Sequence, residues 1–282
     1  MNLSIRRAVV RDIPLLTITP EAAARCPAIF FISGYGGRKE HGLSLGYRLA
    51  ERGFFFISFD ALYHGERYDR RLDHAADPAL GGIYPPDSGL DTGVIFFRVI
   101  HQCLLDVETL LEYFSADPRV DVTRCGVTGP SMGGYASFLI FANITRMLAA
   151  VPMIGLPGFA RRWVDLLDEC AYSNEEWASA LEQVTEQTRV HTAFIQQIDP
   201  YEKLKEAAPR ALLIMSCDFD SDQPKLYTID CYRDLLPHYA ESPDKLRIRV
   251  YPTGHNVTPQ MEQDAVEWFC QHLNPPPSSS QL

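Results

Sequence analysis

The chain has 282 residues, of which 46% are hydrophobic and 22% charged, and its formal net charge is −10. Such a length and composition are ordinary for a globular enzyme, and we expect one α/β domain with insertions over residues 1–282. The acidic balance argues against nucleic acid and anionic membrane surfaces as partners.

The two ends of the chain and its cysteines bear on where the protein resides. Residues 1–7 contain charges before any apolar run long enough for a signal peptide, and no apolar stretch is long enough to cross a bilayer. The seven cysteines are scattered and form no Cys-x-x-Cys pair, which is typical of reduced thiols. We therefore expect a cytoplasmic protein. The composition of residues 274–282 predicts a disordered tail.

Short apolar runs alternate with longer helical patterns along the chain, which predicts a mostly parallel sheet covered by helices on both faces. Residues 5–18 predict an antiparallel pair of strands that turns near Asp12. Buried strands are then expected at residues 27–33, 54–60, 125–128, 149–153, 210–215 and 246–251. Helices are expected at about residues 42–52, 94–115, 135–141 and 259–273.

Residues 155–198 depart from this alternation. Hydrophobic residues, Trp163 and Trp177 among them, recur there at the spacing of amphipathic helices, which predicts a helical cap inserted in the domain. Both tryptophans are candidates for lining an acyl or alcohol pocket, although aromatic residues at this spacing more often serve packing.

The segment Gly129–Gly134 lies where a predicted strand turns into a predicted helix, and its sequence GPSMGG fits G-x-S-x-G. In such a turn, flanking glycines let strand and helix approach closely, and the serine adopts a strained backbone conformation. The motif by itself is equally compatible with an ordinary glycine-rich turn. It makes Ser131 a candidate nucleophile and the Met132 N–H, at the helix N-terminus, a candidate donor to an oxyanion.

Two later loops carry candidate partners for Ser131, because the carboxyl ends of parallel strands lie at one edge of the sheet. His255 follows the last predicted strand and is the expected base for the serine hydroxyl. A carboxylate must hold the imidazole in the right tautomer. The loop after the preceding strand offers three carboxylates. We favour Asp220 as the acid, with Asp222 and Asp218 as the alternatives. The order serine, aspartate, histidine is the one that α/β-hydrolases use.

The second oxyanion donor is expected in the loop after the strand at 27–33, which reads Gly34-Tyr35-Gly36-Gly37. Small residues there let a backbone N–H approach the substrate, and we assign the donor to Tyr35, with Gly36 as the alternative. The loop does not match G-x-G-x-x-G or a P-loop, so a nucleotide site is not indicated. The chain also has no H-E-x-x-H and no Cys/His cluster with zinc spacing, so a metal is not indicated.

Taken together, Ser131, Asp220, His255 and their surroundings resemble the α/β-hydrolase superfamily over nearly the whole chain. Closer in, residues 59–67 (FDALYHGER) and 251–259 (YPTGHNVTP) resemble bacterial esterases of the YitV and YjfP type, which are related to dienelactone hydrolases. The resemblance implies an α/β-hydrolase fold, to which the spacing in residues 155–198 adds a small helical cap, and a small cytoplasmic carboxylic-ester hydrolase. It also implies Ser131 as the nucleophile and His255 as the base.

The chain departs from the pattern of these relatives at three positions. Cys217 stands where a glycine commonly begins the pattern G-x-x-D-x-x-x-P around the acid, while Asp220 and Pro224 fit its second part. Ser33 stands where many relatives have histidine. Pro130 precedes the serine, so its fixed φ must be compatible with the turn.

These residues together predict hydrolysis of a small or short-acyl carboxylic ester through an acyl-serine intermediate, with no cofactor. A peptidase or thioesterase with the same triad, and a non-catalytic protein that binds a ligand on this fold, are the alternatives. The oligomeric state is open, a homo-oligomer included. In the 59–67 segment, His64, Glu66 and Arg67 are interpreted as an ion-paired buttress of a loop near the site rather than as catalytic groups.

Overall fold

The computed structural model describes residues 2–21, 25–68, 90–173, 178–179, 181–182, 185–221 and 223–273. The described residues form one sheet of eight strands in the order β1-β2-β4-β3-β5-β6-β7-β8. The strands are β1 (Leu3–Val10), β2 (Ile13–Pro20), β3 (Cys26–Ile32), β4 (Phe55–Phe59), β5 (Val120–Pro130), β6 (Met147–Met153), β7 (Ala211–Cys217) and β8 (Leu246–Tyr251). The predicted tail at 274–282 lies outside the described residues.

The first two strands form the antiparallel hairpin predicted for residues 5–18, and Arg11 in its turn has φ 55°. β2 also pairs antiparallel with β4, whereas all later neighbours in the sheet pair in parallel. The strands β3, β4 and β7 consist of continuous buried residues because helices cover both of their faces.

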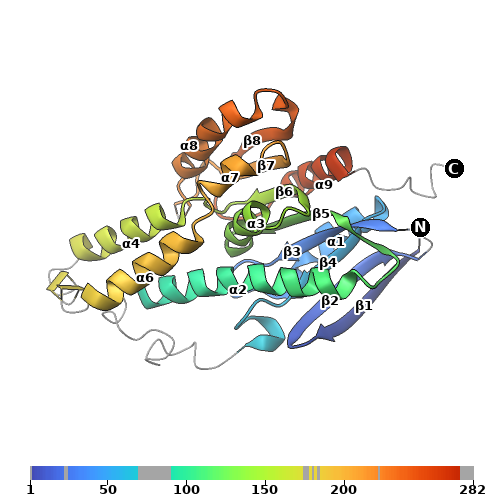
Figure 1. Ribbon diagram of the computed structural model, residues 1–282, viewed down its shortest axis with the longest axis horizontal. Helices are drawn as coiled ribbons and strands as arrows, with labels where there is room; N and C mark the ends of the chain where they lie inside the picture. Colours follow the sequence, from blue (N-terminus) through green and yellow to red (C-terminus); the bar gives the residue numbers. More distant parts are fainter. Residues whose placement is uncertain are drawn as a thin grey trace.

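Helices cover both faces of the sheet (Figure 1). They are α1 (Leu43–Glu51), α2 (Leu90–Phe114), α3 (Met132–Asn143), α4 (Phe159–Ser173), α6 (Thr185–Ile198), α7 (Lys203–Glu206), α8 (Leu226–Leu235) and α9 (Pro259–Leu273). The buried residues of α1 and α9 share one core with the sheet, and those of α2, α3 and α8 share the other. The prediction of a mostly parallel sheet between two helical layers is therefore confirmed.

The helices α4 and α6 fall within the predicted cap at 155–198. They lie side by side and extend beyond the end of the sheet (Figure 1), in contact with α2. Phe159 and Trp163 of α4 and Ile195 of α6 are buried in the core that contains α2. This shared core anchors the two helices to the rest of the molecule.

The helix α8, between β7 and β8, was not predicted from the sequence. Its buried residues Tyr227, Cys231 and Leu235 recur at every fourth position and so lie on one face of the helix. This face packs on the end of the sheet formed by β7 and β8. The helix completes the connection between the two loops that carry Asp220 and His255.

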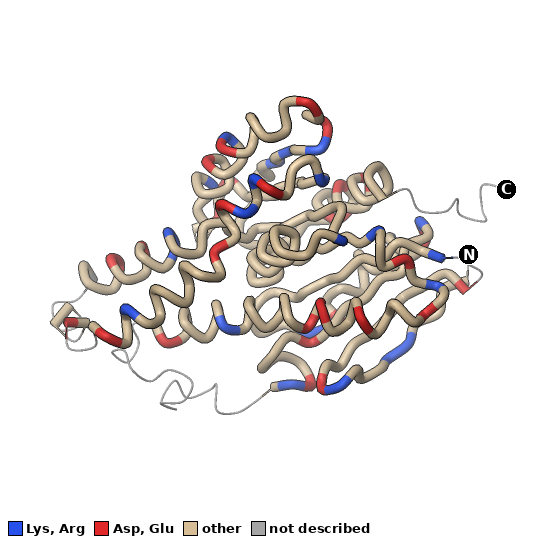
Figure 2. Tube along the Cα trace, viewed as in Figure 1, with Lys and Arg blue, Asp and Glu red and all other residues tan. Residues whose placement is uncertain are grey.

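The remaining surface features are consistent with the composition. Acidic and basic residues are interspersed over the outside of the fold (Figure 2). All seven cysteines are free thiols, and six of them are buried. Within the described ranges, no helix combines the length and the apolar character needed to span a membrane.

Candidate active site

Ser131 lies between the end of β5 and the start of α3, at the sharp turn that the motif predicts. Its backbone has φ 53° and ψ −117°, a conformation that is strained for any residue other than glycine. The turn is held by hydrogen bonds: the Ser131 N–H donates to the Met153 carbonyl at 2.9 Å, and the Ser131 carbonyl accepts from Gly134 at 2.8 Å. Strand pairing and helix formation thus compensate for the backbone strain.

The glycines around Ser131 permit a close approach of α3 to β3. A Cβ atom added to Gly133 would lie 2.0 Å from the Ile32 carbonyl oxygen, and one added to Gly129 would lie at the same distance from that atom. Pro130 is the last residue of β5 and pairs with Met153, so it is compatible with the turn. The spacing of G-x-S-x-G therefore reflects direct contact between two backbones.

The structure brings Ser131, His255 and Asp220 together. The His255 Nε2 atom lies 2.9 Å from the Ser131 Oγ atom, and the His255 Nδ1 atom lies 2.7 Å from Asp220 Oδ2. If Nδ1 carries the proton that it donates to the carboxylate, Nε2 accepts the proton of the serine hydroxyl. Ser131 follows β5, Asp220 follows β7 and His255 follows β8, so all three lie at the carboxyl edge of the sheet.

Asp220 differs from its neighbours in burial and partners. Its side chain is 1% exposed, and its Oδ1 atom accepts the Gln223 N–H at 3.0 Å. Asp218 instead forms an ion pair with Lys225 and is 39% exposed. Asp222 lies outside the described residues. Cys217 is the buried last residue of β7, so its replacement of the usual glycine leaves Asp220 in place.

The loop after β3 lies next to Ser131. A Cβ atom added to Gly34 would be 3.6 Å from the Ser131 Cβ, and the loop turns back through a hydrogen bond from the Gly37 N–H to the Gly34 carbonyl at 2.9 Å. Among the described residues, no acceptor is found for the N–H groups of Tyr35 and Met132. Met132 has none within its own helix because it is the first residue of α3.

A pocket of 210 Å³ lies on the α2 side of this loop. It is lined by Tyr35, Thr92, Gly93, Phe96, Phe97, Tyr135, Arg162, Leu166 and Gln223. The Phe96 ring makes an edge contact with the Tyr135 ring at a centroid distance of 5.0 Å and a tilted contact with the Tyr35 ring at 6.0 Å. The hydroxyl of Tyr135 donates to Gln223 at 2.7 Å, and Gln223 in turn contacts Asp220 through its backbone. Two hydrogen bonds therefore link one wall of the pocket to Asp220.

The sequence did not single out most of these pocket residues, and it placed Trp163 among the candidates. Trp163 is instead fully buried, and its indole N–H donates to Thr192 at 2.9 Å. It packs behind Gly93 and is not among the residues that line the pocket. Trp177, the other candidate, lies outside the described residues. Arg162, next to Trp163 in the chain, lines the pocket instead, and no motif in the sequence marks it.

The 59–67 segment lies beside the same loop. Arg67 forms ion pairs with Asp106 at 2.5 Å and with Asp12 at 3.0 Å, as expected of a buttress. His64 is held differently: its Nδ1 atom donates to the Leu62 carbonyl at 2.8 Å, and its ring packs edge-on against Tyr35 at 5.2 Å. Burial lowers the pKa of His64 below its usual 6.5, which favours the neutral ring.

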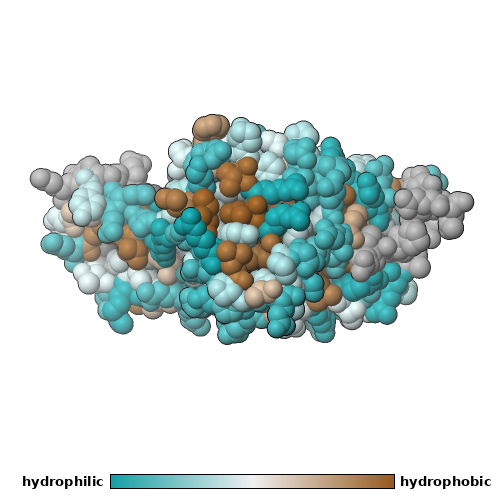
Figure 3. Space-filling view, turned by 90° about the horizontal axis from the view of Figure 1, so that it is seen from above, coloured by the Kyte–Doolittle hydropathy of each residue, from teal (hydrophilic) through white to brown (hydrophobic). Residues whose placement is uncertain are grey.

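Hydrophobic side chains are also exposed on the outer surface. Figure 3 shows hydrophobic side chains near the middle of the face seen from above, with hydrophilic side chains around them. Phe219, beside Asp220 in the chain, and Leu226, at the start of α8, are both exposed.

In the part of the chain that the structure describes, no group of three or more His, Cys, Asp or Glu side chains could hold a metal ion.

Comparison with known proteins supports this architecture. No protein-family model matches the chain. The structure of TT1662 from Thermus thermophilus superimposes with a TM-score of 0.69 at 20% identity, covering 97% of this chain and 99% of that one. An acetyl xylan esterase from Paenibacillus sp. R4 superimposes with a TM-score of 0.68 at 18% identity, over 97% of this chain and 90% of its own. The chain has the α/β-hydrolase fold.

A sequence relative also aligns over almost the full length of this α/β-hydrolase-fold chain. It is the "Putative esterase YitV" of Bacillus subtilis, 26% identical over 274 residues, which covers 96% of this chain and 100% of that protein. The resemblance to the YitV type is thereby confirmed. In an α/β-hydrolase fold, the loops at the carboxyl edge of the sheet are where ligands bind and chemistry takes place.

Proposed function

We propose that the protein is a serine hydrolase that cleaves carboxylic esters through an acyl-serine intermediate. The observation that carries the proposal is the continuous hydrogen-bonded chain from Ser131 through His255 to the buried Asp220. The similarity to a protein named as an esterase, together with the hydrolase fold, supports the ester bond as the target. A small-molecule ester is then the partner that the site takes.

In the acylation half of the reaction, the Ser131 oxygen attacks the ester carbonyl carbon while its proton passes to His255 Nε2. The carbonyl oxygen becomes an oxyanion that accepts hydrogen bonds from the N–H groups of Tyr35 and Met132. Asp220 stabilises the imidazolium that has formed. The intermediate collapses as His255 gives its proton to the departing alcohol, which leaves the acyl group on Ser131.

In the deacylation half, water replaces the alcohol. His255 removes a proton from the water molecule, and the hydroxide attacks the acyl carbonyl carbon in the same oxyanion site. The second tetrahedral intermediate breaks its bond to the Ser131 oxygen, which takes back a proton from His255. The carboxylic acid leaves and the enzyme is restored.

The pocket beside Tyr35 supports a small substrate. An apolar cavity of about 150 Å³ is enough to bind benzene. The 210 Å³ next to Phe96, Tyr135 and Leu166 therefore accommodates one ring or a short chain on one side of the ester. The triad itself does not distinguish an ester from a thioester or peptide, so turnover of all three with the same acyl group decides among these leaving groups.

Labelling with a fluorophosphonate probe tests the nucleophile directly. We expect the wild-type protein to react covalently and the Ser131→Ala variant to lose all labelling, while a Ser115→Ala variant, which alters an exposed serine after α2, labels as wild type does. A folded wild-type protein that does not label, and that hydrolyses no simple ester, would contradict the proposal and favour a ligand-binding role.

A further inference from the structure

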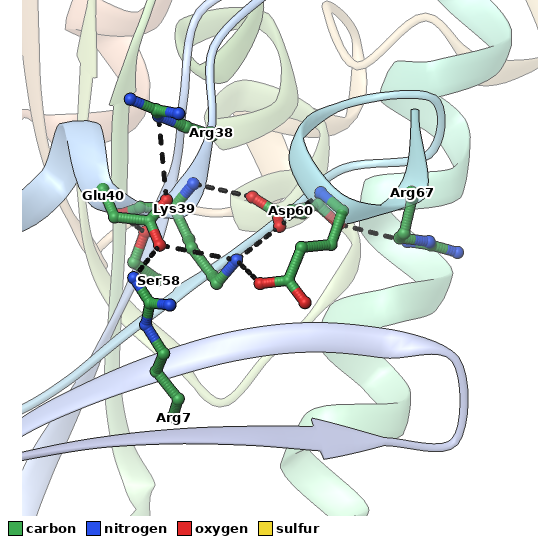
Figure 4. A network of polar contacts seen from close by, with 8 residues as sticks. Arg7, Arg38, Lys39, Glu40, Ser58, Asp60 and Arg67 are labelled. Carbon is green, nitrogen blue, oxygen red and sulfur yellow. Dashed lines mark hydrogen bonds and ion pairs between the residues drawn. The ribbon is translucent and has the colours of Figure 1, made fainter. Parts of the chain in front are cut away.

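A buried ion pair lies next to the site and takes no part in the proposed mechanism (Figure 4). The side chains of Lys39 and Asp60 are 2% and 0% exposed, and Lys39 Nζ lies 2.7 Å from Asp60 Oδ2. Removing two charges from water is costly, and the pair is maintained only with good geometry and additional hydrogen bonds. A buried ion pair often stabilises a fold no more than apolar side chains of similar volume would. The role of this pair is therefore sought in the backbone and side-chain groups to which it is hydrogen-bonded.

The connections of the pair hold the backbone of Lys39 at the end of β4. The Lys39 N–H donates to Asp60 Oδ1 at 2.7 Å, and the Lys39 carbonyl accepts the hydroxyl proton of Ser58 at 2.7 Å. Both backbone groups of one residue are thus fixed by side chains from β4 and its following residue. Lys39 begins the short helix η1 (Lys39–Gly42), which directly continues the loop that carries Tyr35.

The far side of the carboxylate is closed by the short helix η2 (Gly65–Arg67). The Glu66 N–H donates to Asp60 Oδ2 at 3.0 Å, and the Glu66 carboxylate accepts from Lys39 Nζ at 2.5 Å. Gly65 has φ 54°, and a Cβ atom there would lie 2.2 Å from Asp60 Oδ1, so only glycine lets the turn surround the carboxylate.

The charge on Lys39 maintains these connections. Burial by itself would lower the pKa of Lys39, but the hydrogen bonds to Asp60 and Glu66 raise it above the ordinary 10.5. The side chain is therefore an ammonium group throughout the neutral range. It joins two carboxylates that belong to the 60–67 segment to the segment that begins at Gly34.

Between Gly34 and Lys39 the loop has few other supports. The Ser33 hydroxyl is buried and has no hydrogen-bond partner among the described residues, so it does not brace the loop. The other contacts found there are the Gly37–Gly34 hydrogen bond, the packing of Tyr35 against His64 and Phe96, and the hydrogen bond from the His41 N–H to the Arg38 carbonyl. Lys39 is the first residue after this turn whose backbone N–H and carbonyl are both held by side chains of β4 and the residue that follows it.

We infer that Lys39, Asp60 and Ser58 are positioning residues that hold the Tyr35 N–H in the oxyanion site. The inference rests on the proposed function, because it assigns these residues a part in the same reaction. An oxyanion donor acts at about 2.7–3.1 Å from the developing charge, and a displacement of about 1 Å can cost on the order of 10²-fold in rate. A loop whose base is held by this cluster would lose that precision when the cluster is removed.

The test uses a double variant that removes both charges together. Lys39→Met with Asp60→Asn leaves side chains of similar size, avoids a lone buried charge and keeps an amide oxygen to accept the backbone N–H at position 39. The control is Arg124→Met with Asp121→Asn. This variant neutralises an ion pair of 2.7 Å near the start of β5, at the amino ends of the strands and so at the opposite end of the sheet from Ser131. Ser58→Ala is a milder variant that removes one hydrogen bond.

Each protein is assayed with an oxoester and with the matching thionoester, whose sulfur accepts hydrogen bonds from oxyanion donors poorly. For the double variant we expect kcat on the oxoester to fall on the order of 10²-fold, KM to change less than about threefold, and the oxoester-to-thionoester rate ratio to fall. Ser58→Ala should change the same quantities in the same direction by several-fold. The control should leave all three unchanged.

A folded double variant with wild-type kcat and a wild-type rate ratio would overturn the inference. If the double variant does not fold, an unchanged rate ratio in Ser58→Ala overturns it equally. An equal loss of kcat in the control would assign the effect to general destabilisation and would also overturn it. Wild-type protein that hydrolyses neither ester would overturn this inference and the proposed function together, and this outcome is distinct from the others.

Discussion

At Ser131 the backbone and the side chain are held by different parts of the molecule: strand β6 and helix α3 fix the backbone, and His255 contacts the hydroxyl. We expect Ser131→Ala and His255→Ala each to lower kcat on an ester by on the order of 10⁴-fold or more, because either change removes the attack on the carbonyl. Steady-state kinetics with p-nitrophenyl acetate measures this. A loss of less than about tenfold would remove the substituted residue from the proposed mechanism.

The two aspartates on the loop after β7 should differ sharply. We expect Asp220→Asn to lower kcat strongly, because an amide at 2.7 Å from His255 no longer holds the catalytic tautomer. Asp218→Asn should cost much less, since Asp218 contacts Lys225 at the surface. Measuring kcat for both variants side by side decides the matter, and equal losses would call the assignment of Asp220 into question.

At this scale, sequence was informative where the signal is local. Ser131 and His255 stand out because a motif or a strand end marks each of them, and the structure brings them within 2.9 Å. The pocket residue Arg162 and the pair Lys39–Asp60 carry no such mark. Their roles depend on how α4 packs against α2 and on how two loops meet, which spacing along the chain does not reveal.

Among the elements, the contact between α3 and β3 tolerates no additional atom. We expect Gly133→Ala to destabilise the protein by about 2 kcal/mol or more, because its Cβ would lie 2.0 Å from the backbone oxygen of Ile32. Gly93→Ala, in α2, should instead stabilise by about 0.5–1 kcal/mol, since its Cβ meets Trp163 at an ordinary 3.4 Å and alanine favours the helix.

Chemical denaturation of the two glycine variants and the wild type gives these free energies of unfolding. The two substitutions add the same methyl group, so they are matched controls for each other, and opposite signs are the expected result. If Gly133→Ala unfolded at the wild-type denaturant concentration, the close packing of α3 on β3 would be wrong.

The ends of the helices and strands could be predicted where a residue type marks them and not where charged residues interrupt the apolar pattern. Both ends of α9 were predicted, because Pro259 starts the helix and its apolar positions recur up to Leu273. The start of β5 at Val120 was missed, since Asp121 and Arg124 interrupt the apolar run. In the structure these two residues form an ion pair near the amino end of the strand, where Arg124 is partly exposed and Asp121 is buried.

For the molecule as a whole, three histidines make stability depend on pH. Burial lowers the pKa values of His64, His191 and His272 below 6.5 in the folded protein. In the window between those values and 6.5, the unfolded chain binds more protons than the folded protein does. The contribution of these groups is therefore fully present above pH 6.5 and is lost progressively as the pH falls below it.

We expect the free energy of unfolding to be lower at about pH 5.5 than at about pH 7.5, and the difference to shrink in a His191→Gln/His272→Gln variant. Both histidines lie outside the candidate site, so activity serves as a check that the fold is intact. Urea denaturation at the two pH values is the measurement. A difference as large in the variant as in the wild type would show that other groups are responsible.

The assembly of Ser131, His255 and Asp220 from three separate loops also has a consequence for refolding. Ser131 and His255 are 124 residues apart in the chain, and His255 and Asp220 are 35 apart. Closing contacts of such separation is entropically costly, so parallel sheets form slowly relative to local helices. We expect helical circular dichroism to recover first after dilution from denaturant and ester turnover to recover last. Regain of catalysis would then be the reporter of a completed sheet.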